Sequence, residues 1–201
     1  MLNLEALLRV PDVDVLASFD LSLDGHRLAF AWNKSGEWQI HEVDLQNVGQ
    51  ITVVSSGPGG KTAPRYSPDG KFLAYALDLD GSESFHIILH DLATGAAHDL
   101  TPGVDFTIQP LFAWSPDSRQ IAYLADKAGN FDLYIINIDG SGDRLLFSSG
   151  GPAHFVRWAG DGRHIAVTTE TEWQADGTFI VPLVGGEAQR IGGSENPIDA
   201  D

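Results

Sequence analysis

Apolar and polar residues alternate along this chain in short stretches, and four of these stretches share one pattern. Each begins with a basic residue, after which large and small apolar side chains alternate, with alanine at the same place in every copy. The four stretches are Arg27–Phe30, Lys71–Tyr75, Arg119–Tyr123 and Arg163–Val167. Successive side chains of a strand point to opposite faces, so apolar residues on both faces indicate a strand that is covered on both sides. The pattern therefore predicts four inner strands of packed sheets.

A short turn sequence precedes each of these strands, and its aspartates recur at intervals of 45, 48 and 44 residues. In such a turn proline presets φ, aspartate binds its own backbone and glycine accepts a positive φ. The residues that we interpret as structural turn formers are Asp24, Gly25, Ser67, Pro68, Asp69, Gly70, Ser115, Pro116, Asp117, Asp161 and Gly162. A repeat of about 40 to 50 residues is typical of a propeller whose blades have four strands.

The turn joins a first strand to each inner strand, and two further strands follow, which completes the predicted four-stranded blades. The third strands are predicted at 38–43, 85–90, 133–138 and 179–183, and the outer strands at 50–54, 97–100, 143–147 and 188–191. The predicted fold is all-β, a β-propeller of four-stranded antiparallel blades at about 15–56, 62–102, 108–149 and 153–192. Residues 1–14 are expected to form a helical lead-in ending near Pro11, and residues 193–201 a linker or tail.

The charge and composition of the chain limit the kinds of partner that it is expected to bind. The formal net charge is −16, from 28 acidic and 12 basic residues, which argues against nucleic acid because phosphate binding needs clustered Lys and Arg. An acidic surface favours cationic ligands such as peptide amino termini. The sequence has no cysteine, no apolar run long enough to cross a membrane and no basic leader, so we expect a cytoplasmic protein without a membrane partner.

Four blades are few for a closed ring, since propellers usually have four to eight. An open set of blades exposes an apolar face at each end, which is a surface for association. Three states are open: a fragment of a larger propeller with seven or eight blades, a self-associating half ring, and a tight four-bladed ring. We favour the fragment.

The turns and their strands resemble the TolB-like propeller repeat, whose signature is Ser-Pro-Asp-Gly, a Lys or Arg, and an apolar strand containing alanine. The segment Ser67–Tyr75 matches throughout, whereas Leu23 replaces proline in the first copy and Ser118 replaces glycine in the third. The fourth copy keeps only Asp161 to Arg163. The resemblance covers roughly residues 15–192 and implies the propeller fold, in which the repeat serves many functions.

The beginning of the chain adds a second resemblance. Leu7–Pro11, followed by Leu21–Phe30, is similar to the start of prolyl oligopeptidase family serine peptidases of the acylaminoacyl-peptidase-like branch. The resemblance implies a propeller of seven or eight blades placed before an α/β-hydrolase domain, where it admits only short or unfolded peptides. The nucleophile elbow Gly-x-Ser-x-Gly is missing from all 201 residues, so no catalytic residue is assigned. An adjacent Glu-Glu pair, which the dipeptidyl-peptidase branch uses, is missing as well.

Three motifs that suggest ligand sites are better explained as structure. His86 and His90 lie about 13 Å apart on a strand, which is too far for one metal ion. Asp78–Glu83 begins like a calcium loop, but the twelfth position is Leu89, so a hairpin turn is favoured. Gly57–Thr62 resembles a phosphate loop but has Ser55 where the first glycine belongs, and we interpret it as a loop between blades. No metal or cofactor is expected.

One segment remains a candidate for ligand contact. The acidic stretch around Glu170, Glu172 and Trp173 lengthens a turn of the last blade, and its tryptophan suits a cationic ligand. A solvated loop with a packed tryptophan is the alternative.

Three functions follow from these observations. The first is a non-catalytic propeller that gates substrate for a prolyl oligopeptidase family peptidase, whose α/β-hydrolase domain is absent from this chain. The second is a stand-alone TolB-like module that binds a peptide or protein. The third, a lyase or glycan-processing enzyme, requires converging histidines and carboxylates, and the histidines are scattered.

Overall fold

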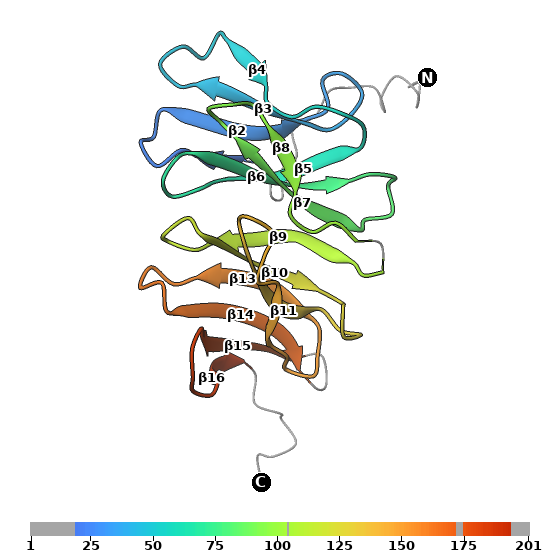
Figure 1. Ribbon diagram of the computed structural model, residues 1–201, viewed down its shortest axis with the longest axis vertical. Helices are drawn as coiled ribbons and strands as arrows, with labels where there is room; N and C mark the ends of the chain where they lie inside the picture. The colour runs from blue at the N-terminus through green and yellow to red at the C-terminus, as the bar shows by residue number, and fades with distance from the viewer. Residues whose placement is uncertain (1–18, 104, 172–174, 194–201) are drawn as a thin grey trace, which may run out of the picture. The chain divides into compact units, whose positions relative to one another are not determined.

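The computed structural model describes residues 19–103, 105–171 and 175–193 (Figure 1). The helix predicted for residues 1–14, the ligand candidates Glu172 and Trp173, and the tail from residue 194 lie outside these residues. The chain divides into two compact units, unit 1 (residues 1–99) and unit 2 (residues 100–201).

Unit 1 contains two four-stranded antiparallel sheets, blade 1 and blade 2, in which neighbouring strands follow one another in the chain (Figure 1). The strands of blade 1 are β1 (Phe19–Leu21), β2 (Arg27–Trp32), β3 (Gln39–Asp44) and β4 (Ile51–Val53). The strands of blade 2 are β5 (Gly60–Tyr66), β6 (Phe72–Asp78), β7 (Phe85–Asp91) and β8 (Ala97–Asp99).

Unit 2 repeats this organisation with blade 3 and blade 4. The strands of blade 3 are β9 (Ile108–Trp114), β10 (Gln120–Ala125), β11 (Asp132–Asn137) and β12 (Arg144–Phe147). The strands of blade 4 are β13 (Ala153–Trp158), β14 (His164–Thr171), β15 (Ala175–Pro182) and β16 (Gln189–Gly193). The prediction of an all-β chain with four four-stranded antiparallel blades is confirmed.

The observed strands differ from the predicted ones mainly in blade 4. The third strand, predicted at 179–183, is the longer β15, because β14 and β15 remain paired as far as Thr171 and Ala175. Pro182 ends β15, where its missing N–H removes no interior ladder bond. The alternation of apolar residues indicates only the packed part of this hairpin, so the sequence pattern does not predict its polar extension.

The repeated turn joins the first and second strands of every blade. In blade 1, Ser22 Oγ donates to Asp24 Oδ1 (2.5 Å) and accepts the N–H of Arg27 (2.9 Å). The equivalent Ser67–Asp69 and Ser115–Asp117 bonds are both 2.7 Å. The last turn position has a positive φ, 71° at Gly25 and 60° at Ser118, so the third copy keeps the turn geometry at a non-glycine residue. The turn thus fixes the register of each inner hairpin.

Blades 1 and 2 pack through unlike faces. Blade 1 contributes Ala29, Ala31 and Ile40, all fully buried, against Tyr66, Leu73, Tyr75 and Ile88 of blade 2. We call the first kind of surface the alanine face and the second kind the bulky face. Small side chains on one sheet let the large side chains of its neighbour approach closely, which gives a dense interior.

Blades 3 and 4 pack by the same rule. The alanine face of blade 3 includes Ala122, Leu124, Leu133 and Ile135, and the bulky face of blade 4 includes Trp158, Ile165, Val167 and Val181. In each unit, therefore, the alanine face of one blade meets the bulky face of the next blade in the chain.

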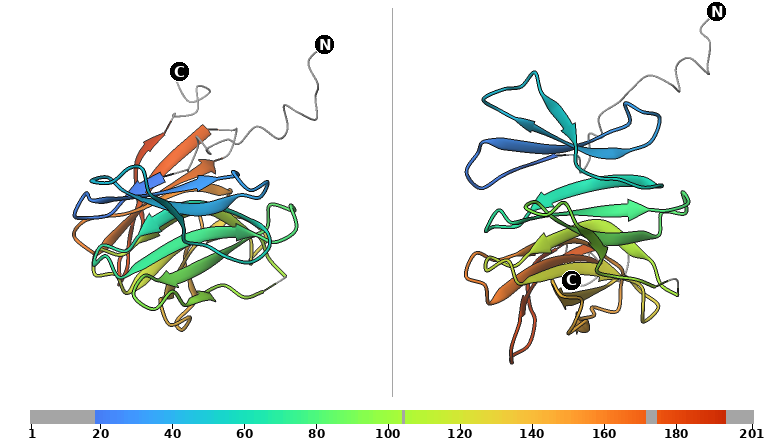
Figure 2. Two further views of the ribbon diagram at one scale, coloured as in Figure 1. Left: turned by 90° about the horizontal axis from the view of Figure 1, so that it is seen from above. Right: turned by 45° about the horizontal axis from the view of Figure 1, so that its top comes forward.

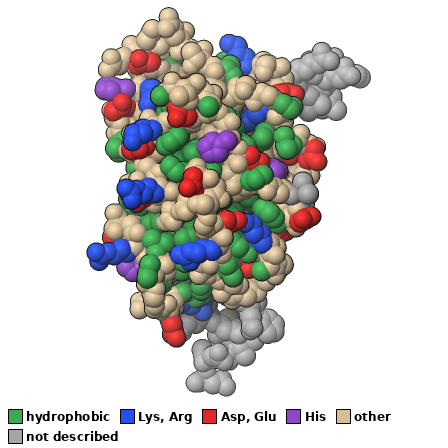
Figure 3. Space-filling model, in the orientation of Figure 1, with side chains coloured by type: hydrophobic (Ala, Val, Ile, Leu, Met, Phe, Trp, Pro, Cys, Tyr) green, Lys and Arg blue, Asp and Glu red, His purple; other side chains and the backbone are tan. Residues whose placement is uncertain are grey.

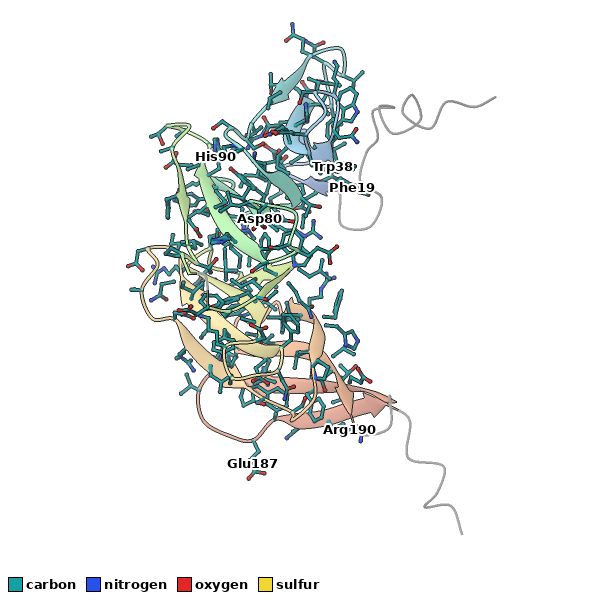
Figure 4. All side chains as sticks on the ribbon, turned by 90° about the vertical axis from the view of Figure 1, so that its right-hand side faces the viewer. Phe19, Trp38, Asp80, His90, Glu187 and Arg190 are labelled. Carbon is teal, nitrogen blue, oxygen red and sulfur yellow. The ribbon has the colours of Figure 1, made fainter. Side chains whose placement is uncertain are left out.

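A buried lysine holds the segment that leads into β5. The Nζ of Lys61 donates to the carbonyl oxygens of Gly57, Pro58 and Gly59, at 2.5, 3.0 and 2.8 Å, and the residue is only 1% exposed. The N–H of Lys61 donates to the carbonyl of Trp38 (2.9 Å), a residue of blade 1 labelled in Figure 4. A phosphate loop directs N–H groups at its ligand, whereas here carbonyl oxygens surround a cation. The predicted loop is also shorter than expected, since β5 already begins at Gly60.

Candidate functional site

A hollow of unit 2 lies between two copies of the repeated turn. It has a volume of about 410 Å³, and we call it the turn cleft. The residues that line it are Ser115, Pro116, Asp117, Gln120, Trp158, Gly160, Asp161 and Gly162. Blade 3 supplies one turn and blade 4 the other, because the repeat places equivalent turns on the same side of neighbouring blades. Unit 1 has a smaller hollow of about 340 Å³ beside Gly70 and Asp91.

The turn cleft offers hydrogen-bond acceptors to a ligand. Bonds from Ser115 Oγ and the N–H of Arg119 hold the pKa of Asp117 below its usual value, and the N–H of Arg163 and the ring of His164 do the same for Asp161. Both carboxylates are therefore ionised at neutral pH.

Trp158, which lines this cleft, has a buried indole N–H. Trp158 is 7% exposed, and its Nε1 has no hydrogen-bond partner in the structure. A buried N–H without a partner is unusual, because leaving it unpaired costs about 1–3 kcal/mol. This N–H is closed to solvent, so what the cleft offers a ligand is the carboxylates of Asp117 and Asp161, which suit N–H donors or a cation.

Acid is expected to weaken the four turns together. The pKa values of Asp24, Asp69, Asp117 and Asp161 are all lowered, for Asp24 mainly by the hydroxyl of Ser22. A carboxyl whose pKa is lower in the folded state stabilises that state above its unfolded pKa, and this stability is lost as the pH falls through the folded pKa. We expect the urea midpoint to be nearly constant above about pH 5 and to fall below about pH 4. Changing all four residues to asparagine should flatten this fall, and an unchanged slope would contradict the assignment.

A second cluster in unit 2 surrounds the ammonium of one lysine. The Nζ of Lys127 lies over the rings of Phe106 (4.4 Å), Tyr134 (4.9 Å) and Tyr123 (5.2 Å), and it forms an ion pair with Asp143. Tyr123 Oη accepts from Lys127 (2.7 Å) and donates to Asp143 Oδ1 (2.5 Å). Burial, followed by the bond to Asp143, raises the pKa of Tyr123 well above its usual range, so its hydroxyl remains a donor. We call these five residues the lysine cluster.

Replacing Lys127 by methionine is expected to lower the free energy of unfolding by about 2 kcal/mol, because a shielded cation over several rings is worth about this much. Lys34 is a matched control, since its Nζ contacts the single ring of Trp32 at 4.8 Å. Lys34→Met should cost about 0.5 kcal/mol, as exposed cation–π contacts do. Thermal unfolding of both variants measures the difference, and equal losses would show that the three-ring arrangement adds nothing.

The remaining predicted residues are placed as follows. Glu170 is half-buried at the end of β14, and its two predicted neighbours lie outside the described residues, so the ligand contact predicted for this segment stays a prediction. His86 and His90 lie on β7, where His86 Nδ1 pairs with Asp99 Oδ2 at 2.7 Å (His90 is labelled in Figure 4). Within the described segments, no group of three or more His, Asp or Glu side chains is arranged to hold a metal ion.

The predicted calcium-loop start is the hairpin turn between β6 and β7, in which Asp78 Oδ1 accepts the N–H groups of Asp80 (3.3 Å) and Gly81 (2.9 Å). Figure 4 shows Asp80 in this hairpin. The carboxylate oxygen of Asp78 is thus occupied by its own backbone, as an Asx turn requires.

Sequence reasoning missed the lysine cluster. Comparison of the repeats contains the signal: Tyr134 occupies the cross-strand position of Ile88 in blade 2. Lys127 follows Tyr123 by four residues, as Leu79 follows Tyr75. A tyrosine and a lysine at positions where blade 2 has isoleucine and leucine indicate a local interaction that the fold itself does not require.

Figure 3 shows one face of the molecule, on which acidic and basic side chains are interleaved. The part of the chain that the structure describes includes no helix with the length and hydropathy needed to span a bilayer.

Two curated proteins illustrate the range of sequence relatives. The chain is 32% identical to dipeptidyl-peptidase 5 of Porphyromonas gingivalis over 135 residues, which are 61% of this chain and 19% of that protein. It is 30% identical to the TolB homolog of Chlorobaculum tepidum over 131 residues, 65% of this chain and 29% of that protein. The chain therefore spans less than a third of the length of either relative.

Solved structures share the fold at low identity. The putative TolB from Agrobacterium tumefaciens superposes with a TM-score of 0.74 at 18% identity, covering 88% of this chain and 64% of that one. A puromycin-hydrolyzing peptidase from Mycobacterium tuberculosis superposes with a TM-score of 0.66 at 17% identity, covering 83% of this chain and 30% of that one.

The TolB beta propeller domain family, PD40, matches residues 5–194. This match spans all four blades, and the repeated turn, the sheet order and the shared fold agree with it. The chain belongs to the TolB β-propeller domain family.

Proposed function

We propose that this chain is the non-catalytic propeller segment of a prolyl oligopeptidase family serine peptidase, in which it restricts access of substrate to a hydrolase domain outside these residues. The observation that carries the proposal is the 32% identity to a dipeptidyl-peptidase that is about five times longer than the matched segment. The lack of a nucleophile elbow in the sequence agrees with a gating role.

The ligand in this proposal is a peptide, and the turn cleft is its first contact. Asp117 and Asp161 attract a cationic amino terminus. The net charge of −16 strengthens the attraction at low salt. A cytoplasmic location belongs to the proposal as well, and cell fractionation tests it.

The alternative is a stand-alone module that binds a peptide or protein without any peptidase partner. The 30% identity to a TolB homolog favours it. Both functions use the same propeller, so the fold does not separate them.

The native gene beyond the codon for Asp201 decides between the two. The peptidase proposal expects further Ser-Pro-Asp-Gly repeats and then a Gly-x-Ser-x-Gly elbow in the same frame. A stop codon directly after Asp201 would contradict it and leave the binding module.

Peptide binding is tested on the chain itself. Titration with fluorescent hexapeptides should give a weaker dissociation constant when the amino terminus is acetylated, by about 10-fold for one lost charged hydrogen bond. Gln120→Ala, in the turn cleft, should weaken binding, whereas Lys71→Ala, in unit 1, should leave it unchanged. Equal binding of free and acetylated peptides would contradict the role assigned to the carboxylates.

A further inference from the structure

The turn cleft of unit 2 has a counterpart in unit 1, and the two differ in their side chains. In each unit the first strand of the second blade lies against the first two strands of the first blade: β5 against β1 and β2, and β13 against β9 and β10 (Figure 2). Arg27 and Gln120 are equivalent, because each lies three residues after the aspartate of its turn. Tyr66 and Trp158 are equivalent too, since each pairs across the strands with the residue four positions after such an aspartate.

In unit 1, Arg27 of blade 1 places its guanidinium over an aromatic ring of blade 2. The Cζ of Arg27 lies 5.4 Å from the ring centroid of Tyr66, and its Nη1 lies 3.5 Å from Oε2 of Glu42. Tyr66 Oη donates to the same carboxylate (2.6 Å). A cation, a ring and a carboxylate thus meet between the two blades, where partial shielding from water strengthens the contact between cation and ring.

In unit 2 the ring of this arrangement remains, but its cation and its carboxylate are replaced. Gln120 takes the place of the arginine, and its Nε2 donates to Oδ1 of Asn137, its cross-strand neighbour, at 2.9 Å. Ile135 takes the place of the glutamate in the cross-strand register. Trp158 takes the place of the tyrosine and lines the hollow of about 410 Å³.

The repeated turns supply carboxylates to this hollow. Among the described residues, both bonds that Asp117 accepts within its turn end on Oδ1, from Ser115 Oγ (2.7 Å) and the N–H of Arg119 (3.2 Å), which leaves Oδ2 for a ligand. Asp161 uses Oδ1 for its own turn and Oδ2 for the ring of His164 (2.7 Å). The described residues that line the cleft therefore include a ring and an open carboxylate oxygen but no Lys or Arg.

We propose that the turn cleft binds an arginine side chain of the ligand, with the guanidinium over the ring of Trp158 and its N–H groups donating to Asp117, in the manner of Arg27 in unit 1. A guanidinium is planar, stacks on aromatic rings and donates in a fork that matches a carboxylate, whereas an ammonium is a compact point charge. The inference rests on the proposed function, in which the ligand is a peptide, and adds which residue of that peptide the cleft selects.

Binding of a small probe tests the site itself. The probe is N-acetyl-arginine amide, which has a guanidinium but no charged amino terminus, and its uncharged counterpart of the same shape is N-acetyl-citrulline amide. In heteronuclear NMR spectra of the full chain, the indole signal of Trp158, identified by its loss in Trp158→Phe, should shift on titration with the arginine probe. The citrulline probe should bind at least about 10-fold more weakly. Equal affinities, or no shift with either probe, would overturn the inference.

Position 120 allows the charge of the cleft to be changed in both directions. Gln120→Arg supplies a guanidinium from the chain itself, as in unit 1, and should weaken binding of the arginine probe about 10-fold, whereas Gln120→Glu should strengthen it about 10-fold. Gln46→Arg and Gln46→Glu are matched controls, because Gln46 is exposed in unit 1 and the net charge changes equally. The controls should bind like the original chain. Equal effects at the two positions would mean that only the net charge matters, which contradicts a guanidinium site.

Hexapeptides separate this inference from the function on which it rests. Two peptides with free amino termini differ only in having arginine or citrulline at the second position, and the arginine peptide should bind about 10-fold more tightly. If both bind equally, the preference for arginine is wrong and peptide binding stands. If neither peptide binds although the arginine probe does, peptide binding is wrong and the guanidinium site stands.

Discussion

Replacing Lys61 by methionine is expected to lower the free energy of unfolding by about 4 kcal/mol, the largest effect of any single side chain in unit 1. The ammonium is the shared donor for three carbonyl oxygens, and each buried acceptor left without a donor costs about 1–3 kcal/mol. Methionine fills a similar volume, so the loss reports the missing hydrogen bonds rather than a cavity. Urea denaturation followed by tryptophan fluorescence measures it.

Lys71→Met is the control for this change. Its side chain is 73% exposed and pairs only with Asp69, so the expected loss is below about 0.5 kcal/mol. If both variants lose the same stability, the carbonyl oxygens of the Gly57–Gly59 segment do not depend on Lys61.

Replacing Gly59 by alanine is expected to cost about 3 kcal/mol, through steric conflict added to backbone strain. Gly59 has a φ of 89°, and a Cβ there would overlap the carbonyl oxygen of Asp78 and press on Leu79. Gly57 has a similar φ of 80° with nothing within 4 Å of a Cβ, so Gly57→Ala should cost only the roughly 1 kcal/mol of a left-handed alanine. Thermal unfolding of the two variants separates crowding from conformation, and equal midpoints would show that the loop moves away from Asp78.

The four blades could be predicted because their causes are local. Each turn is fixed by bonds between residues at most five positions apart, such as Ser22 with Asp24 and Arg27. The alternation of large and small residues around Ala29 and its equivalents then indicates which strands are covered on both faces. Even Ser118, which departs from the glycine of the repeat, keeps the turn because the other bonds remain.

The lysine cluster could not be predicted from local rules. Phe106 precedes blade 3, Asp143 lies just before its last strand, and only the folded blade brings both to Lys127. The segment before β5 shows a related limit, because glycine spacing suggests a phosphate loop but does not tell whether N–H groups or carbonyl oxygens point inward. The structure shows carbonyl oxygens, which reverses the sign of the charge that the loop accepts.

The strand order of the sheets has a consequence for how the chain folds. In every blade each strand pairs with the strand next to it in the chain, so each hairpin closes over a short loop and little chain entropy is lost before contacts form. During synthesis, blade 1 can assemble as soon as Val53 has left the ribosome, and blade 2 then provides the bulky face that covers its alanines. Folding is expected to proceed from the amino terminus in blade-sized steps, with the second blade of each unit stabilising the first.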